Sequence, residues 1–138
     1  MDIKGKTVLV VGAGLSGVEA CRYLVKQGAR AILQDNKSRE QLGAGLDALE
    51  QAGVRLLLGN QLPERVEWDL AVISPGVPPG IPLLMMTREA GLEVIGEIEL
   101  AFRAARASFI GVTGTNGKTT VTSLLGAILE QAGIPALV

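Results

Sequence analysis

The chain has 138 residues, of which 48% are hydrophobic, 20% charged and 3% aromatic, and its formal net charge is −1. This balance excludes an intrinsically disordered chain, and with no basic block it gives no sign of binding to nucleic acid or an anionic membrane. One cysteine and no histidine exclude a disulfide framework and argue against a zinc site. Because no apolar run is as long as a membrane span and no signal peptide opens the chain, we expect a cytoplasmic α/β protein.

The first predicted elements form a βαβ unit. A valine-rich run at 6–11 is typical of a strand buried on both faces, and it leads into the pattern G-x-G-x-x-G at Gly12–Gly17. Residues 18–27 then predict a helix that ends at Gly28, and residues 30–33 predict a second strand. Asp35 follows at about the distance where a ribose-binding unit has its acidic residue.

Two interpretations of this unit remain open. One is a nicotinamide or flavin site, with Asp35 on the ribose. The other is a glycine turn that packs a helix tightly on a strand and binds nothing. Because strand, glycine pattern, helix and Asp35 occur together, we favour a nucleotide-like ligand, whose identity these residues leave open.

The middle of the chain predicts a helix and two more strands. Ser38–Ala52 has an apolar stripe and a serine at the N-cap position, although glycines at 43 and 45 weaken it as a helix. Residues 54–58 and 70–73 are the next apolar strands. A proline- and glycine-rich loop, Ser74–Gly80, follows them.

The loops that follow these strands suggest a site. In a parallel sheet the glycine turn, Asp35–Asn36 and Ser74–Gly76 would all lie at the carboxyl edge. Open α/β sheets bind their ligands at that edge. A rigid connector would explain the Ser74 loop equally well by composition alone, so it is the shared position that favours a binding site.

The last third of the chain ends in a phosphate-binding pattern. Residues 83–90 and 97–105 predict helices, with a strand at 92–95 between them. A further strand at 108–112 leads into Gly114–Thr120. The helix that follows is predicted over 121–131, and 136–138 resembles the beginning of another strand.

Strand, glycine loop, Gly-Lys-Thr and helix are the arrangement of a P-loop, in which backbone N–H groups, a lysine and a hydroxyl hold phosphates and Mg²⁺. The strict pattern has a glycine where this chain has Val112; the glycines here are at 111, 114 and 117. An ordinary strand–turn–helix with a surface lysine is the alternative. The flanking elements favour a nucleoside triphosphate site.

These patterns predict a Rossmann-like parallel sheet with flanking helices, followed by the first βα unit of a second, truncated α/β domain. We expect the first domain at 1–95, a linker helix at 96–107 and the start of an ATP-binding domain at 108–138.

A dinucleotide-like fold followed by a P-loop resembles the Mur ligases of peptidoglycan synthesis, and the resemblance covers the whole chain. The motifs that carry it are Gly12–Gly17, Ser74–Val77, Gly96–Leu100 and Gly114–Thr120. Within this resemblance, Asn116 and the Glu97–Leu100 segment favour the members that add D-glutamate. The alanine-adding members typically have histidine at the position of Asn116.

The resemblance implies that the first domain binds no NAD and holds the UDP part of the substrate. The residues that it implies for this site are Gly14, Leu15, Ser16, Asp35, Asn36, Lys37, Ser74, Pro75 and Gly76. For ATP it implies Gly114, Thr115, Asn116, Gly117, Lys118, Thr119 and Thr120. Lys118 and Thr119 would be the catalytic residues, and Thr119 would also be a ligand of Mg²⁺.

The implied reaction is ATP-dependent amide formation. The carboxylate of UDP-N-acetylmuramoyl-L-alanine would become an acyl phosphate, which the amine of D-glutamate then attacks. An acidic metal ligand, a modified lysine, a histidine ligand and a glutamate-binding domain are expected parts that the 138 residues lack, so we expect this chain alone to be inactive. We also expect a monomer.

Two other hypotheses compete with this one. A nicotinamide-binding module from an oxidoreductase, or from a potassium-channel-type regulatory domain, would leave Gly111–Thr120 unexplained. A non-catalytic nucleotide-binding module, complete as it stands, is the third.

Overall fold

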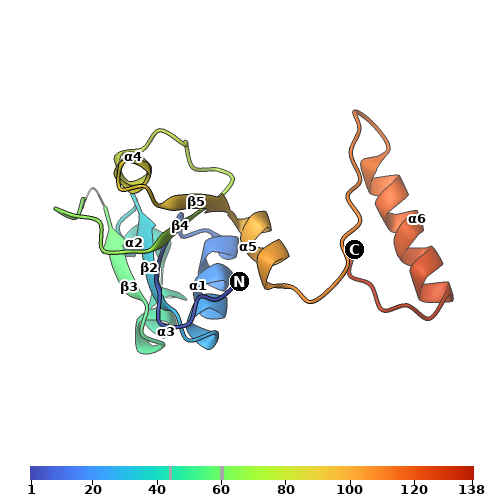
Figure 1. Ribbon diagram of the computed structural model, residues 1–138, viewed down its shortest axis with the longest axis horizontal. Coiled ribbons are helices and arrows are strands. Elements are labelled where there is room, and N and C mark those ends of the chain that lie inside the picture. Colours follow the sequence, from blue (N-terminus) through green and yellow to red (C-terminus); the bar gives the residue numbers. More distant parts are fainter. Residues whose placement is uncertain (44, 60) are drawn as a thin grey trace. The chain divides into compact units, whose positions relative to one another are not determined.

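One parallel sheet organises the first 105 residues of the computed structural model, which describes residues 1–43, 45–59 and 61–138. Among these residues the strands are β1 (Thr7–Val11), β2 (Arg30–Asp35), β3 (Arg55–Leu58), β4 (Leu70–Ile73) and β5 (Glu93–Gly96). Their order across the sheet is β3-β2-β1-β4-β5 and every pairing is parallel (Figure 1). All carboxyl ends therefore lie at one edge, and the predicted α/β fold with a parallel sheet is confirmed.

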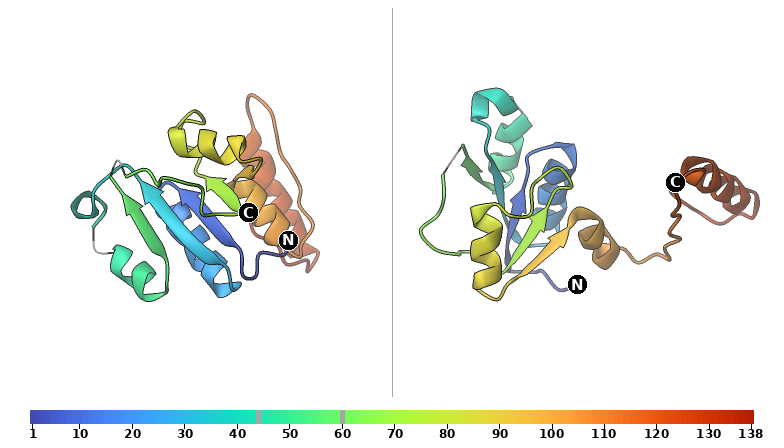
Figure 2. Two further views of the ribbon diagram at one scale, coloured as in Figure 1. Left: turned by 60° about the vertical axis from the view of Figure 1, so that its left-hand side comes forward. Right: turned by 90° about the horizontal axis from the view of Figure 1, so that it is seen from above.

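Helices cover both faces of this sheet, as Figure 2 shows from two further sides. Their bounds are α1 (Leu15–Lys26), α2 (Arg39–Leu42), α3 (Gly45–Gln51), α4 (Pro82–Glu89) and α5 (Glu97–Ala104), with α6 (Lys118–Gln131) in the second unit. Buried side chains of α1, α3 and α5 share one core cluster, whereas those of α4 belong to the other. Among the described residues no helix is both long and apolar enough to cross a membrane.

The alternation of side chains along β1 explains why the sheet has two cores. Val8 and Val10 are buried in the cluster with α1, while Leu9 and Val11 are buried in the cluster with α4. Successive side chains of a strand point to opposite faces, so a continuous apolar run is what a strand covered on both sides requires. Trp68 is buried in the second cluster, and its indole N–H donates to the hydroxyl of Thr87 at 3.0 Å.

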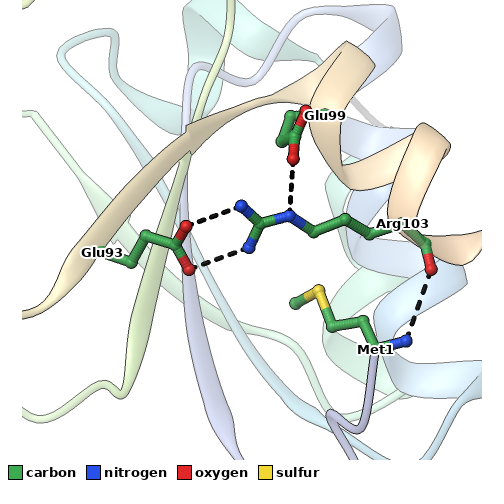
Figure 3. A network of polar contacts seen from close by, with 4 residues as sticks. All are labelled: Met1, Glu93, Glu99 and Arg103. Carbon is green, nitrogen blue, oxygen red and sulfur yellow. Dashed lines mark hydrogen bonds and ion pairs between the residues drawn. The ribbon is translucent and has the colours of Figure 1, made fainter.

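Helix α5 is fastened to the sheet unit by apolar packing and by an arginine. Leu100 is buried in the first core cluster. Arg103 donates two hydrogen bonds to the carboxylate of Glu93, at 2.6 and 2.8 Å, and one to Glu99 at 2.7 Å (Figure 3). These carboxylates raise the pKa of Arg103, and Arg103 lowers the pKa of Glu93. The helix expected as a linker therefore packs within the compact unit Met1–Ala105.

Several predicted boundaries differ in the structure. The single helix expected over 38–52 is instead α2 and α3, because Gly43 has φ +80°, a left-handed conformation that interrupts a right-handed helix. Ala44, part of that prediction, lies outside the described residues. Helix α1 begins at Leu15 rather than at 18, so the last glycine of the pattern is helical. Strand β2 continues to Asp35, which pairs with Leu58 of β3.

The second unit, Arg106–Val138, contains α6. The strands expected at 108–112 and 136–138 are not formed, and that prediction was wrong. A strand needs a neighbour to accept and donate its backbone hydrogen bonds, and no described residue pairs with either segment. None of the residues of α6, all of which the structure describes, is buried.

Candidate functional site

The glycine turn between β1 and α1 depends on close approaches that only glycine allows. Gly12 has φ +108°, and a Cβ on it would lie 2.9 Å from the Cβ and Oγ of Ser74. A Cβ on Gly17 would lie 1.9 Å from the carbonyl oxygen of Gly12. The backbone N–H of Gly12 donates to the carbonyl of Gln34 at 2.8 Å, which ties the turn to β2. The first and last glycines therefore fix the path of the turn.

The middle glycine of the pattern has a different environment. Gly14 precedes the first residue of α1 in an extended conformation, with φ −69° and ψ 178°, and a Cβ on it would meet nothing within 4 Å. No side chain of the described residues caps this end of the helix. Uncapped N–H groups and the positive end of the helix dipole favour an anion there. The side chain of Leu15 beside it is 85% exposed, so it offers apolar surface at the same place.

Asp35 joins the glycine turn to the loop after β2. One carboxylate oxygen accepts from the backbone N–H of Ala13 at 2.8 Å, and the other accepts from the N–H of Lys37 at 2.9 Å. The amide oxygen of Asn36 accepts from the buried side chain of Gln34 at 3.0 Å. Asp35 thus holds two loops in register across the carboxyl edge, a structural role that the sequence did not indicate.

We expect Asp35→Ala to lower the free energy of unfolding of the first unit by about 1–2 kcal/mol, because the half-buried N–H of Ala13 loses its acceptor. Urea unfolding followed by the fluorescence of Trp68, the single tryptophan, measures this. Lys37→Ala is the matched control, since it keeps the backbone N–H that Asp35 binds. Equal unfolding midpoints for both variants and the parent chain would contradict the role of Asp35.

The loop after β4 reaches the same turn. The N–H of Ser74 donates to the carbonyl of Val11 at 3.1 Å, and its hydroxyl donates to Glu97, at the start of α5, across 2.5 Å. Pro75 and Gly76 follow in exposed positions. The structure therefore brings the three predicted loops together at one edge of the sheet. Their ligand roles stay predictions.

Glu97 is a residue of this edge that the predicted site omitted. The sequence places Glu97 in the Gly96–Leu100 motif. Because it also predicts that the fifth strand ends at 95, it does not indicate that residue 97 lies at the carboxyl edge of the sheet. The register pair Ile73–Gly96 makes residues 74 and 97 direct neighbours at that edge. An open groove of about 460 Å³ beside it is lined by Ser16, Glu19 and Glu97 together with mostly apolar residues of α1 and α5.

The predicted P-loop lies in the second unit. Gly114 and Gly117 have φ +148° and +78°. Gly117 occupies the N-cap position of α6 without a side-chain cap, and the first residues of the helix are Lys118 and Thr119. The ammonium of Lys118 donates to the carbonyl oxygen of Gly114 at 2.7 Å, so the lysine folds back over its own loop. Thr115, Asn116 and Thr120 are exposed. These residues form an open turn at a helix N-terminus, which is compatible with a phosphate.

The described part of the chain gives little support for a metal site or for a reactive cysteine. No three residues among His, Cys, Asp and Glu gather there as a metal site. Cys21 is buried on α1, and burial raises its pKa to about 12, so the thiol is an unreactive core residue.

The comparisons with known proteins agree with this geometry. Residues 6–96 match the family model of the Mur ligase MurD-like N-terminal domain. The UDP-N-acetylmuramoylalanine–D-glutamate ligase of Alkaliphilus metalliredigens is 44% identical over 137 residues, 96% of this chain and 30% of the relative. That of Desulfatibacillum aliphaticivorans is 45% identical over 139 residues, 100% of this chain and 31% of the relative. The chain thus spans about a third of the length of these relatives.

A solved structure shares the fold. UDP-N-acetylmuramate-alanine ligase from Thermotoga maritima superimposes with a TM-score of 0.62 over 91% of this chain and 29% of that one. Its sequence is 18% identical, so it supports the architecture alone.

Proposed function

The chain belongs to the Mur ligases with a MurD-like N-terminal domain, and we propose that its first unit binds the UDP part of UDP-N-acetylmuramoyl-L-alanine. The observation that carries this proposal is the open N-terminal turn of α1 at the carboxyl edge of the sheet, where Gly14 leaves room for a ligand. The names of the relatives supply the identity of that ligand.

The residues at this edge suit a nucleoside diphosphate. Backbone N–H groups at Gly14, Leu15 and Ser16 offer donors and a positive dipole end to the diphosphate. The exposed side chain of Leu15 offers apolar surface to the base. Asp35 and Asn36 would contact the uracil, with the exposed Lys37 nearby as a cationic contact.

We propose further that Gly114–Thr120 form the phosphate-binding part of an ATP site. The residues fit this ligand because the glycines turn the loop at the uncapped start of a 14-residue helix, and Lys118 already lies over the loop. Lys118 would exchange the Gly114 carbonyl for phosphate oxygens, and the hydroxyl of Thr119 would be a ligand of Mg²⁺. In this proposal residues 1–95 bind the UDP part, residues 108–138 bind ATP, and residues 96–107 link the two.

ATP with Mg²⁺ would supply the phosphoryl group that turns the substrate carboxylate into an acyl phosphate, from which the amine of D-glutamate displaces phosphate. A carboxylate is a poor electrophile, and phosphorylation supplies the leaving group. Lys118 would neutralise charge on the transferring group, which is an electrostatic contribution. Peptidoglycan synthesis is the process to which this reaction belongs in the relatives' family.

The complete reaction needs more than these residues, in our proposal. The chain spans about a third of the length of its relatives, and we assign none of its residues to D-glutamate. We propose binding without turnover for the 138 residues alone, as a monomer.

Calorimetric titration of the 138-residue chain with UDP-N-acetylmuramoyl-L-alanine, NADH and ATP–Mg²⁺, each separately, tests the proposal. We expect heat of binding from the UDP compound and none from NADH. Tight binding of NADH together with no response to the UDP compound would overturn the proposal and favour the oxidoreductase hypothesis. Measurement of phosphate release with all three substrates of the ligase reaction tests the expected lack of turnover.

A further inference from the structure

Ser74 and Glu97 make a direct contact between two adjacent strands at the carboxyl edge. Ser74 follows β4 and Glu97 follows β5, one residue beyond the register pair Ile73–Gly96. The hydroxyl of Ser74 donates to a carboxylate oxygen of Glu97 across 2.5 Å, and both residues are half-buried.

The same hydroxyl lies against the glycine turn. Ser74 Oγ is 2.9 Å from the position that a Cβ would take on Gly12, and 3.5 Å from the corresponding position on Gly17. Its backbone N–H is bonded to Val11, the last residue before the turn. The Ser74 side chain therefore fills the space beneath the turn, between its first and last glycines.

A serine hydroxyl carries a single proton, and here that proton is directed to Glu97. Phosphate oxygens need donors, so a hydroxyl used in this way offers a diphosphate only lone pairs. Glu97 is a carboxylic acid residue in the first turn of α5. A carboxylate would repel a diphosphate rather than bind it.

We propose that Ser74 and Glu97 are a positioning pair, which holds the glycine turn in the shape that receives the diphosphate while neither side chain touches it. This inference rests on the proposed function. It departs from the direct substrate contact expected for Ser74 and gives Glu97 a role in the site. The pair also connects the turn to α5, so the start of that helix and the ligand-binding edge are held together.

A double-mutant cycle in the 138-residue chain tests the pair. The variants are Ser74→Ala, Glu97→Ala and their combination, with affinity for UDP-N-acetylmuramoyl-L-alanine measured by calorimetry. Each single change should weaken binding about tenfold, and the double variant should bind no more weakly than either single one. Glu97→Gln keeps an acceptor oxygen and should restore most of the affinity. Glu99→Gln is the control, because its partner is Arg103.

A readout without ligand separates failure of the pair from failure of the proposed function. The backbone amide signals of Gly12 and Gly17 in a ¹H–¹⁵N spectrum should shift in ligand-free Glu97→Ala and remain in place in Glu99→Gln. Unchanged glycine signals in Glu97→Ala would overturn the pair. So would a Ser74→Ala effect on affinity that persists undiminished beside Glu97→Ala, since Ser74 would then contact the ligand directly. Lack of binding by the unmodified chain would overturn the proposed function and, with it, the role we give the pair in receiving the diphosphate.

Discussion

Replacing Gly17 by alanine should lower the free energy of unfolding of the first unit by about 3 kcal/mol, the upper part of the usual range for overpacked sites. Gly17 is buried in the first turn of α1, and an added Cβ would lie 1.9 Å from the carbonyl oxygen of Gly12. That oxygen belongs to the backbone, so relief requires α1 to move away from the turn. The helix cannot move freely, because Cys21 and Leu24 anchor it in the core.

Urea unfolding monitored by the fluorescence of Trp68 measures this effect, since that residue is 4% exposed within the same unit. Gly14→Ala is the matched control three residues away: its Cβ meets nothing within 4 Å and its φ of −69° is ordinary for alanine. We expect the control to unfold within about 0.5 kcal/mol of the parent chain. Similar midpoints for Gly17→Ala and Gly14→Ala would contradict the close packing of the turn.

The contrast between these glycines marks the limit of sequence-based inference at this site. The pattern G-x-G-x-x-G predicted a tight turn between strand and helix, and the parallel sheet with its common carboxyl edge followed from apolar runs alone. The spacing could not say which glycine is packed and which is open. For Gly12 that distinction depends on where Ser74, 62 residues later, is placed by the pairing of β4 with β1. For Gly17 it depends on how closely the folded turn brings the carbonyl oxygen of Gly12 to the helix.

Other features escaped prediction because they depend on partners distant in sequence. The ligand role expected for Asp35 stays a prediction, but its hydrogen bond with the backbone N–H of Ala13, 22 residues earlier, was not predicted. The apolar segment at 108–112 has the composition of a strand but does not form a strand in the structure. Composition alone cannot provide the neighbouring strand with which it would pair. Composition and spacing therefore predict where helices, strands and turns lie along the chain. They do not predict which residues become hydrogen-bond partners, because the fold decides that.

Substituting valine at Gly14 should weaken binding of UDP-N-acetylmuramoyl-L-alanine at least tenfold, or about 1.4 kcal/mol, while leaving stability within about 0.5 kcal/mol. A valine is sterically allowed at φ −69° and ψ 178°, so the fold has no reason to change. Its side chain would fill the space that the protein leaves empty at the start of α1 and would keep a diphosphate from the backbone N–H groups.

Calorimetry measures the affinity, and urea unfolding verifies that the variant is folded. Gly45→Val is the matched control, because a Cβ there also meets nothing within 4 Å and Gly45 begins α3, outside the three loops of the site. Equal affinities for Gly14→Val and Gly45→Val would remove the glycine turn from the binding site, and the UDP compound would then have to bind elsewhere on the chain. Loss of affinity in Gly14→Val alone would separate the two functions of one motif: Gly12 and Gly17 shape the turn, and Gly14 leaves it open to the ligand.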